Sequence, residues 1–170
     1  MKTLILPILL FFSILTASAQ SWQDRPLNTA RLDFMGFTSM MSVQYERLLI
    51  NRETWMLTVM VGSGFNAEGD FCPFGDCTVN RVNYMSVPHA VSLSYGLDRH
   101  FVEISAGGAA LLGNTAHHYA FYPTIGYRFN PMESGKLQLR AYAGYPFYDG
   151  NGNDSDILFS PLGISVGIGF

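Results

Sequence analysis

Two cysteines and two adjacent histidines are the first residues of this chain that could do chemistry. Cys72 and Cys77, in FCPFGDCT, are the only cysteines, and the further Cys or His that a metal site would need beside them is not evident. His117 and His118 are neighbours, which point in opposite directions on an extended segment and so make a poor chelate. We expect a disulfide, the default for cysteines of an exported chain, and solvated histidines.

A second candidate is the acidic loop DGNGNDSD. Its acids do not follow the D-x-D-x-D-G spacing of a calcium loop, and Gly, Asn and Asp are the residues that turns require in any case. The acids are Asp149, Asp154 and Asp156. We therefore expect no metal and no cofactor.

Most other charges recur at every second position of apolar segments. In KLQLRAYAGY, Lys136, Gln138 and Arg140 alternate with Leu137 and Leu139. A period of two is typical of a β-strand with one polar and one apolar face. The same alternation places on polar faces Arg31, Asp33, Gln44, Glu46, Glu103, Arg128, Lys136, Gln138 and Arg140.

Eight such segments cover the chain, and helical periodicity is nearly absent. Each segment has about the 9–11 residues that a tilted strand needs to cross a bilayer. The predicted strands are 30–38, 41–50, 55–65, 86–96, 101–112, 121–129, 136–145 and 161–170.

The first residues, MKTLILPILLFFSILTASAQ, have the basic start, apolar stretch and A-x-A triplet of a secretory signal peptide. The apolar stretch is too short for a membrane-spanning helix. We expect a signal peptide over 1–19 and one domain over 20–170. The formal charge of −3 argues against nucleic acid as a partner. Few charges with many aromatics and glycines suit strands that face lipid.

The links between the predicted strands alternate in length. The second, fourth and sixth are short turns, while the third and seventh are long and polar. Short turns at one end and long loops at the other are typical of outer-membrane barrels, whose turns face the periplasm. The first link, Thr38–Met40, is tight and departs from this pattern.

YERLL in the second strand, the strand count, the short turns and the terminal aromatic residue together resemble small eight-stranded outer-membrane barrels of the OmpA/OmpX type. The resemblance implies an all-β, antiparallel, up-and-down transmembrane β-barrel. It also implies that the last strand closes the barrel against the first and is the signal read by the barrel-assembly machinery. The residues that would carry this signal are Gly163, Val166, Ile168 and Phe170.

An apolar face turned to lipid leaves the polar face in the lumen, which eight strands make just narrow enough for side chains to fill. We expect Glu103 and Arg128, near the same end of adjacent strands, to pair. Because unpaired buried charges are costly, we expect a plug of paired charges and no conducting pore. Its members would be Arg31, Asp33, Glu46, Glu103, Arg128, Lys136 and Arg140.

Aromatic residues near both strand ends suggest two interfacial girdles. The set toward the short turns is Trp55, Tyr45, Tyr95, Tyr127, Phe129 and Phe170; the set toward the long loops is Phe65, Tyr84, Phe121, Tyr122, Tyr145 and Phe147.

Two alternatives stay open. A soluble lipocalin-like carrier of a hydrophobic ligand also has eight strands, with the apolar face inward. Some outer-membrane barrels are lipid A deacylases or acyltransferases; the deacylases share a His-x-Ser pair, whereas His89 here is followed by Ala90-Val91. We expect His89 to be an interfacial anchor.

The preferred hypothesis is a monomeric, non-porin barrel of the Gram-negative outer membrane with a structural or surface-contact role and no enzymatic activity. Its partners would be outer-membrane lipid, lipopolysaccharide and, during insertion, the assembly machinery.

Overall fold

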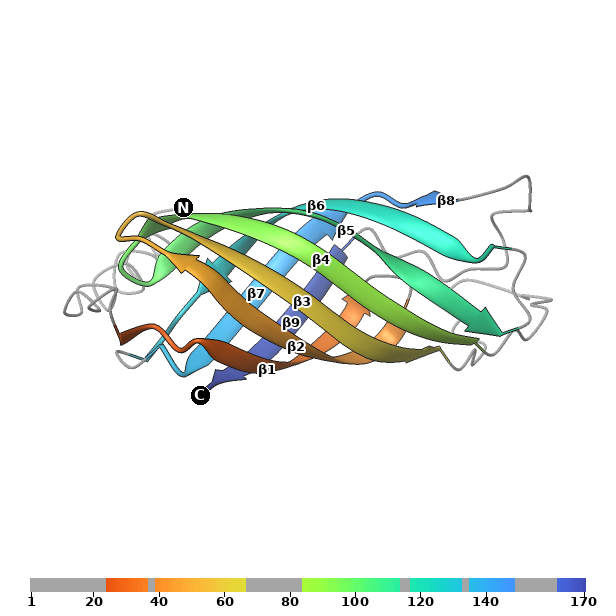
Figure 1. The fold of residues 1–170 in the computed structure, drawn as a ribbon, viewed down its shortest axis with the longest axis horizontal. Helices are drawn as coiled ribbons and strands as arrows, with labels where there is room; N and C mark the ends of the chain where they lie inside the picture. The colour runs from red at the N-terminus through yellow and green to blue at the C-terminus, as the bar shows by residue number, and fades with distance from the viewer. Residues whose placement is uncertain (1–23, 37–38, 67–83, 114–116, 133–134, 149–161) are drawn as a thin grey trace, which may run out of the picture.

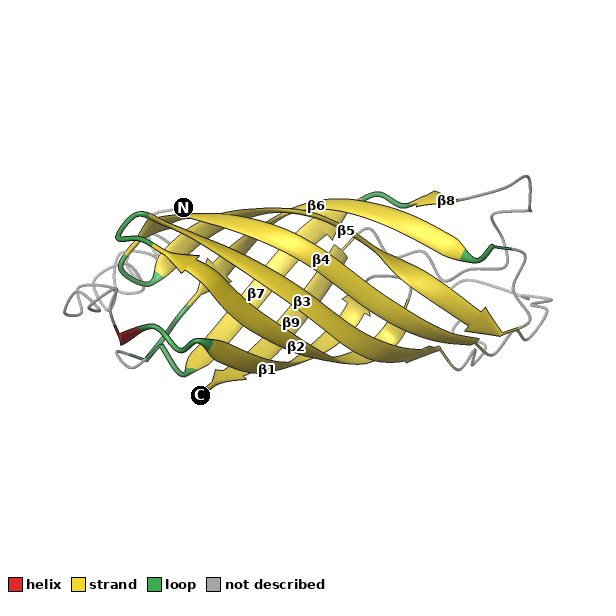
Figure 2. Ribbon diagram, in the orientation of Figure 1, coloured by secondary structure: helices red, strands yellow, loops and turns green. Residues whose placement is uncertain are grey.

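The computed structural model describes residues 24–36, 39–66, 84–113, 117–132, 135–148 and 162–170. Almost all of them form strands (Figure 2). The strands are β1 (Asn28–Gly36), β2 (Ser39–Asn51), β3 (Trp55–Asn66), β4 (Tyr84–Leu97), β5 (His100–Gly113), β6 (Tyr119–Phe129), β7 (Leu137–Gly144), β8 (Phe147–Tyr148) and β9 (Leu162–Gly169).

These strands form one closed antiparallel barrel with up-and-down connectivity (Figure 1). Each strand from β1 to β6 pairs with the next, β6 pairs with β7, and β7 pairs with β9. The last strand then closes the ring against the first, from Thr29 opposite Gly169 to Phe34 opposite Ile164. The expectation of an eight-stranded barrel closed by its terminal strand is confirmed.

β7 and β8 are two pieces of one barrel strand. Both pair with β6, β7 as far as Gly144 and β8 from Phe147 onward. Tyr145 and Pro146 separate them, and a proline has no N–H to donate to a ladder. The seventh strand was predicted to end at Tyr145. In the structure β7 ends at Gly144, and β8 continues the same barrel strand.

The register of the ladders measures how far the strands are staggered. We follow the paired residues once around the barrel. The path starts at Leu137, which is opposite Ile168, and crosses β1 to β5. It reaches Phe121 on β6, which is opposite Phe147. The path therefore returns to the seventh strand at residue 147 instead of 137, ten residues further on. A stagger of ten over eight strands corresponds to a tilt of about 40°. Figure 1 shows the strands inclined to the long axis of the barrel.

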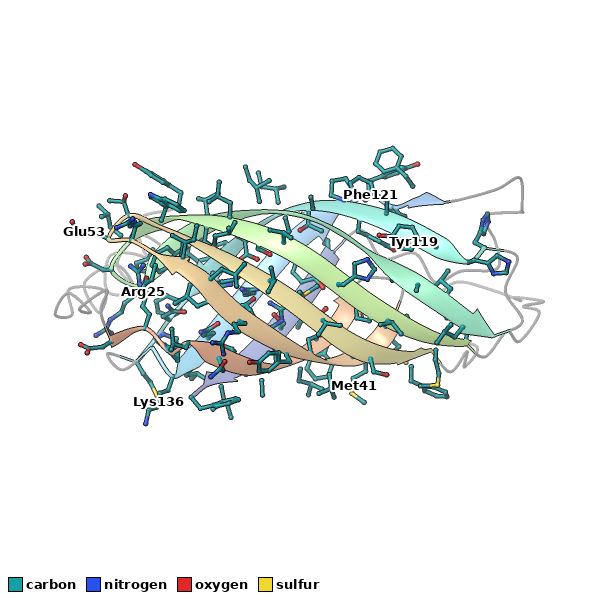
Figure 3. The ribbon with its side chains drawn as sticks, viewed as in Figure 1. Arg25, Met41, Glu53, Tyr119, Phe121 and Lys136 are labelled. Carbon is teal, nitrogen blue, oxygen red and sulfur yellow. The ribbon has the colours of Figure 1, made fainter. Side chains whose placement is uncertain are left out.

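The two faces of the wall have opposite character. On β5, Val102 and Ile104 point outward and are 54% and 60% exposed, whereas Glu103 and Ser105 between them are buried inside. Large apolar side chains cover the outside of the other strands in the same way (Figure 3). The polarity of the barrel is thus the reverse of that of a soluble protein.

No helix in the described part of the chain is long and apolar enough to cross a membrane.

The barrel interior is layered along its axis. Leu48, Met56 and Phe101 form a small apolar cluster at the end that carries the β2–β3 and β4–β5 turns, called here the short-turn end. A second cluster, which contains Tyr84 and Leu111, lies toward the opposite end, called here the loop end. Charged residues from the middle of the strands lie between these clusters.

Candidate functional site

Glu46 on β2 is the centre of the buried charges. Its carboxylate accepts from Arg31 Nη1 of β1 at 3.2 Å, from Arg128 Nη2 of β6 at 2.9 Å and from Arg140 Nη2 of β7 at 2.5 Å. All four side chains are at most 5% exposed. One carboxylate thus joins strands from opposite sides of the barrel.

Glu103 on β5 extends this network. Arg128 reaches it at 2.9 Å and Arg140 at 3.1 Å, and Ser94 donates to it at 2.9 Å. The predicted pair of Glu103 and Arg128 is confirmed. The sequence did not indicate that Glu46 would share both arginines.

Asp33 on β1 lies at one edge of the network. It accepts from Tyr142 Oη at 2.5 Å and from Gln44 Nε2 at 3.1 Å. Gln44 in turn accepts from Arg31 Nε at 2.9 Å. This cluster, called here the charge plug, contains Arg31, Arg128, Arg140, Asp33, Glu46 and Glu103; its three arginines and three carboxylates cancel in formal charge.

Lys136 is not part of the charge plug, and its predicted place in the lumen is wrong. It precedes β7 and is exposed, pointing away from the barrel at the short-turn end (Figure 3). Its position has the same parity as Gln138 and Arg140, which are buried. Parity fixes the direction of a side chain only inside a ladder, and a lysine beyond the ladder reaches water without cost.

The interior around the charge plug is filled. One void, beside Arg31, Arg140 and Tyr142, has a volume of about 10 Å³. A second of about 10 Å³ lies toward Arg25 and Gln138. Each is about the size of one water molecule. The arrangement can hold strands together, and neither void is large enough for an organic ligand.

Tyr142 ties the closing strand in place. Its ring extends from β7 across Gly163 of β9 to reach Asp33 of β1. A Cβ at Gly163 would overlap this ring. The sequence assigned Gly163 to an assembly signal, and the structure adds that only a glycine leaves room for the tyrosine. Val166, Ile168 and Phe170 point outward and are exposed.

Arg25, which no sequence pattern indicated, is buried at the short-turn end of the barrel. It lies before β1, outside any alternating segment, and yet is only 6% exposed. Figure 3 shows it beside the turn that carries Glu53. Burial, and next the charge of Arg128, lower the pKa of the guanidinium of Arg25.

His89 lies on the outside of β4, as expected, with both ring nitrogens engaged. Nδ1 lies 3.1 Å from Val87 O and Nε2 lies 3.0 Å from Tyr119 Oη. Tyr119 crosses Gly108 of β5 to make this contact. The pair resembles an anchor more than a general base, because a base needs a nitrogen that is open to the substrate.

The other histidine and aromatic predictions fare unevenly. His117 is buried and His118 is exposed, so only the second is solvated. Tyr84 and Tyr122, expected in the loop-end girdle, point inward and are each 2% exposed. Phe121, Tyr145 and Phe147 do form an outward aromatic group, with ring centroids 5.5 and 6.3 Å apart.

Several predicted features lie outside the described residues. These are the signal peptide over 1–19, the cysteines Cys72 and Cys77, and the acids Asp149, Asp154 and Asp156. Among the residues that the structure does describe, no group of three or more His, Cys, Asp or Glu could hold a metal ion.

Comparison with protein-family models, with curated proteins and with solved structures finds no match to this chain. The class is therefore defined by the fold itself: an eight-stranded, antiparallel, up-and-down closed β-barrel with a charged interior and an apolar exterior.

Proposed function

We propose that this chain is an integral, monomeric β-barrel of the outer membrane of a Gram-negative bacterium, with a structural or surface-contact role. The observation that carries the proposal is the reversed polarity of the wall. A soluble monomer seldom exposes an apolar patch beyond a few hundred Å². Here the outward apolar side chains surround the barrel, with Ile164 and Ile168 of the closing strand 60% and 63% exposed.

The height of the apolar exterior fits a bilayer. On β5 it runs from Val102 to Leu112. Ten residues at about 3.3 Å each, tilted by about 40°, span about 25 Å, the height of the apolar band of outer-membrane barrels. Closure of the ladder pairs the strand backbones, which hydrocarbon requires because it offers no hydrogen bonds.

The charge plug supports a non-porin role. Water-filled pores belong to barrels of about 16 or more strands. Here Glu46, Arg128 and Arg140 meet across the interior. An ion would have to separate these buried pairs in order to pass, at a cost of several kcal/mol.

The alternatives receive less support. A lipocalin-like carrier needs an apolar cavity of about 300 Å³ or more for its ligand, and the interior here is charged and filled. A lipid-modifying enzyme would use His89, whose Nε2 is engaged by Tyr119. No observation favours either alternative.

The proposed partners follow from the location. Outer-membrane lipid and lipopolysaccharide would surround the apolar wall, and the assembly machinery would read the terminal strand. The candidate contact surface is the pair of long loops predicted from the sequence, one of which we expect to carry a disulfide between Cys72 and Cys77, while the other contains Asp149–Asp156.

The test is fractionation followed by gel electrophoresis with and without boiling. We expect the protein in the outer-membrane fraction, with a band that shifts on boiling because a closed barrel stays folded in detergent. Recovery in a soluble fraction without a shift would contradict the proposal. A large conductance in planar bilayers would contradict the non-porin role.

A further inference from the structure

A residue that belongs to no strand is buried at the short-turn end of the barrel. Arg25 donates from Nη1 to Asn51 Oδ1 at 3.2 Å and to Arg52 O at 2.8 Å, and from Nη2 to Glu53 O at 3.0 Å. These contacts attach the segment before β1 to the β2–β3 turn.

The flat face of the same guanidinium covers an aromatic ring. Cζ of Arg25 lies 4.8 Å from the ring centroid of Phe101, which is fully buried. A cation over an aromatic face is a favourable contact, and more so where water is excluded. Phe101 packs with Leu48 and Met56, so Arg25 rests on the apolar cluster at this end.

The Nε donor of Arg25 is not used by these contacts. Its Nε is buried without a protein partner, and Arg25 lines a void of about 10 Å³. Asn130 and Gln138 line the same void, and Asn130 Oδ1 and Gln138 Oε1 are also buried without a partner. Gln138 Nε2 donates to Thr29 Oγ1 at 3.1 Å, and Oε1 is the end of the amide that faces no protein donor.

The buried hydroxyl of Thr58 lines the same void, so one N–H, two amide oxygens and one hydroxyl define the chemistry of its occupant. A water molecule accepts from an N–H and donates to two oxygens, and buried waters typically make about three such bonds. A cation would be repelled by Arg25 and Arg128, which line the void, and about 10 Å³ leaves no room for an anion larger than one water molecule. The site is therefore suited to a small neutral molecule.

We propose that Arg25 and one water molecule, bound between Arg25 Nε, Asn130 Oδ1 and Gln138 Oε1, seal the short-turn end of the barrel. The seal lies in series with the charge plug. It shields the pair in which Arg128 Nε donates to Glu103 at 3.0 Å. This inference does not depend on where the barrel resides, since it concerns the interior alone.

The test is NMR of arginine Nε–Hε groups in the detergent-solubilised barrel, residues 20–170. We expect a cross-peak between Arg25 Hε and water, with slow exchange of this proton. Gln138→Met should abolish the cross-peak because it removes one acceptor. Thr29→Val is the matched control: it removes the partner of Gln138 Nε2, leaves Oε1 in place and should keep the cross-peak.

Substitution of Arg25 gives a second measurement. Arg25→Met should raise the exchange rate of Arg128 Hε at least tenfold, in a variant whose gel shift shows that the barrel is closed. The sealing role of Arg25 is refuted if Arg25 Hε of the wild type exchanges with water as fast as Hε of Arg47, which is exposed. The water is refuted if Arg25 Hε is protected and shows no cross-peak. Neither result bears on the proposed location in the outer membrane.

Discussion

Removal of the charge of Glu46 is the sharpest test of the charge plug. Glu46→Gln keeps the shape of the side chain and leaves three buried arginines with two carboxylates. Breaking a buried ion pair from one side costs about 3–5 kcal/mol, because the remaining charge stays buried without compensation.

The network limits this cost to about one pair. Arg128 and Arg140 keep Glu103 at 2.9 and 3.1 Å, so each retains a carboxylate. Arg31 keeps only neutral acceptors, Gln44 at 2.9 Å and Met60 Sδ. We therefore expect Glu46→Gln to lower the free energy of unfolding by about 3–5 kcal/mol, and not by three times that amount.

Two related variants give a ranking. Glu103→Gln should cost less, because Arg128 and Arg140 then keep Glu46 and Arg31 is untouched. Asp33→Asn should cost least, because the neutral Tyr142 and Gln44 are its hydrogen-bond donors and an amide oxygen can still accept from Tyr142.

The assay is urea unfolding of the refolded barrel in lipid vesicles, followed by tryptophan fluorescence and by the gel shift. Equal slopes against urea concentration would show that the variants differ in stability alone. A double variant, Glu46→Gln with Arg31→Met, should recover part of the loss, since it removes the arginine that was left without a carboxylate. The reasoning is refuted if Glu46→Gln loses less than Asp33→Asn.

Three further pairs of substitutions test the wall and its closure. Tyr142→Phe should cost about 1.5–3 kcal/mol in the same urea assay, as for hydrogen bonds to charged groups; equal stability of this variant and wild type would exclude a stabilising bond from Tyr142 to Asp33. Gly163→Val should prevent the gel shift, because its side chain overlaps the tyrosine ring. Val91→Arg, level with Ala106 near the middle of the apolar band, should cost about 2–4 kcal/mol in vesicles, and Tyr95→Arg near the short-turn end about 0–1 kcal/mol. Equal costs would argue against a bilayer around the wall. Phe170→Ser should slow assembly in a gel-shift time course with the purified machinery. Tyr95→Ser is the control and should not slow it, since Tyr95 is 67% exposed and Phe170 65%. Equal assembly rates of the two variants would contradict the proposed signal.

Local alternation made the strands and their faces predictable. Val102 and Ile104 point outward and Glu103 and Ser105 inward because successive side chains of a strand point to opposite faces. The pair of Glu103 and Arg128 was also within reach, since β5 and β6 are consecutive strands and therefore neighbours in an up-and-down barrel.

Other contacts depend on the stagger between strands, which no local pattern contains. Glu46 meets Arg128 and Arg140 because a stagger of ten residues brings the middle of β2 level with β6 and β7 across the lumen. Lys136 was assigned to the lumen by parity, and the end of the ladder leaves it outside.

The sequence by itself determined that this protein is a barrel of alternating strands with charges on one face, because a period of two is a property of neighbouring residues. The tertiary structure alone decided that Glu46 joins three arginines, that Tyr142 passes over Gly163 to Asp33, and that Arg25 packs on Phe101. These contacts join residues from 15 to 109 positions apart in the chain, and only the closed ring brings the most distant of them together.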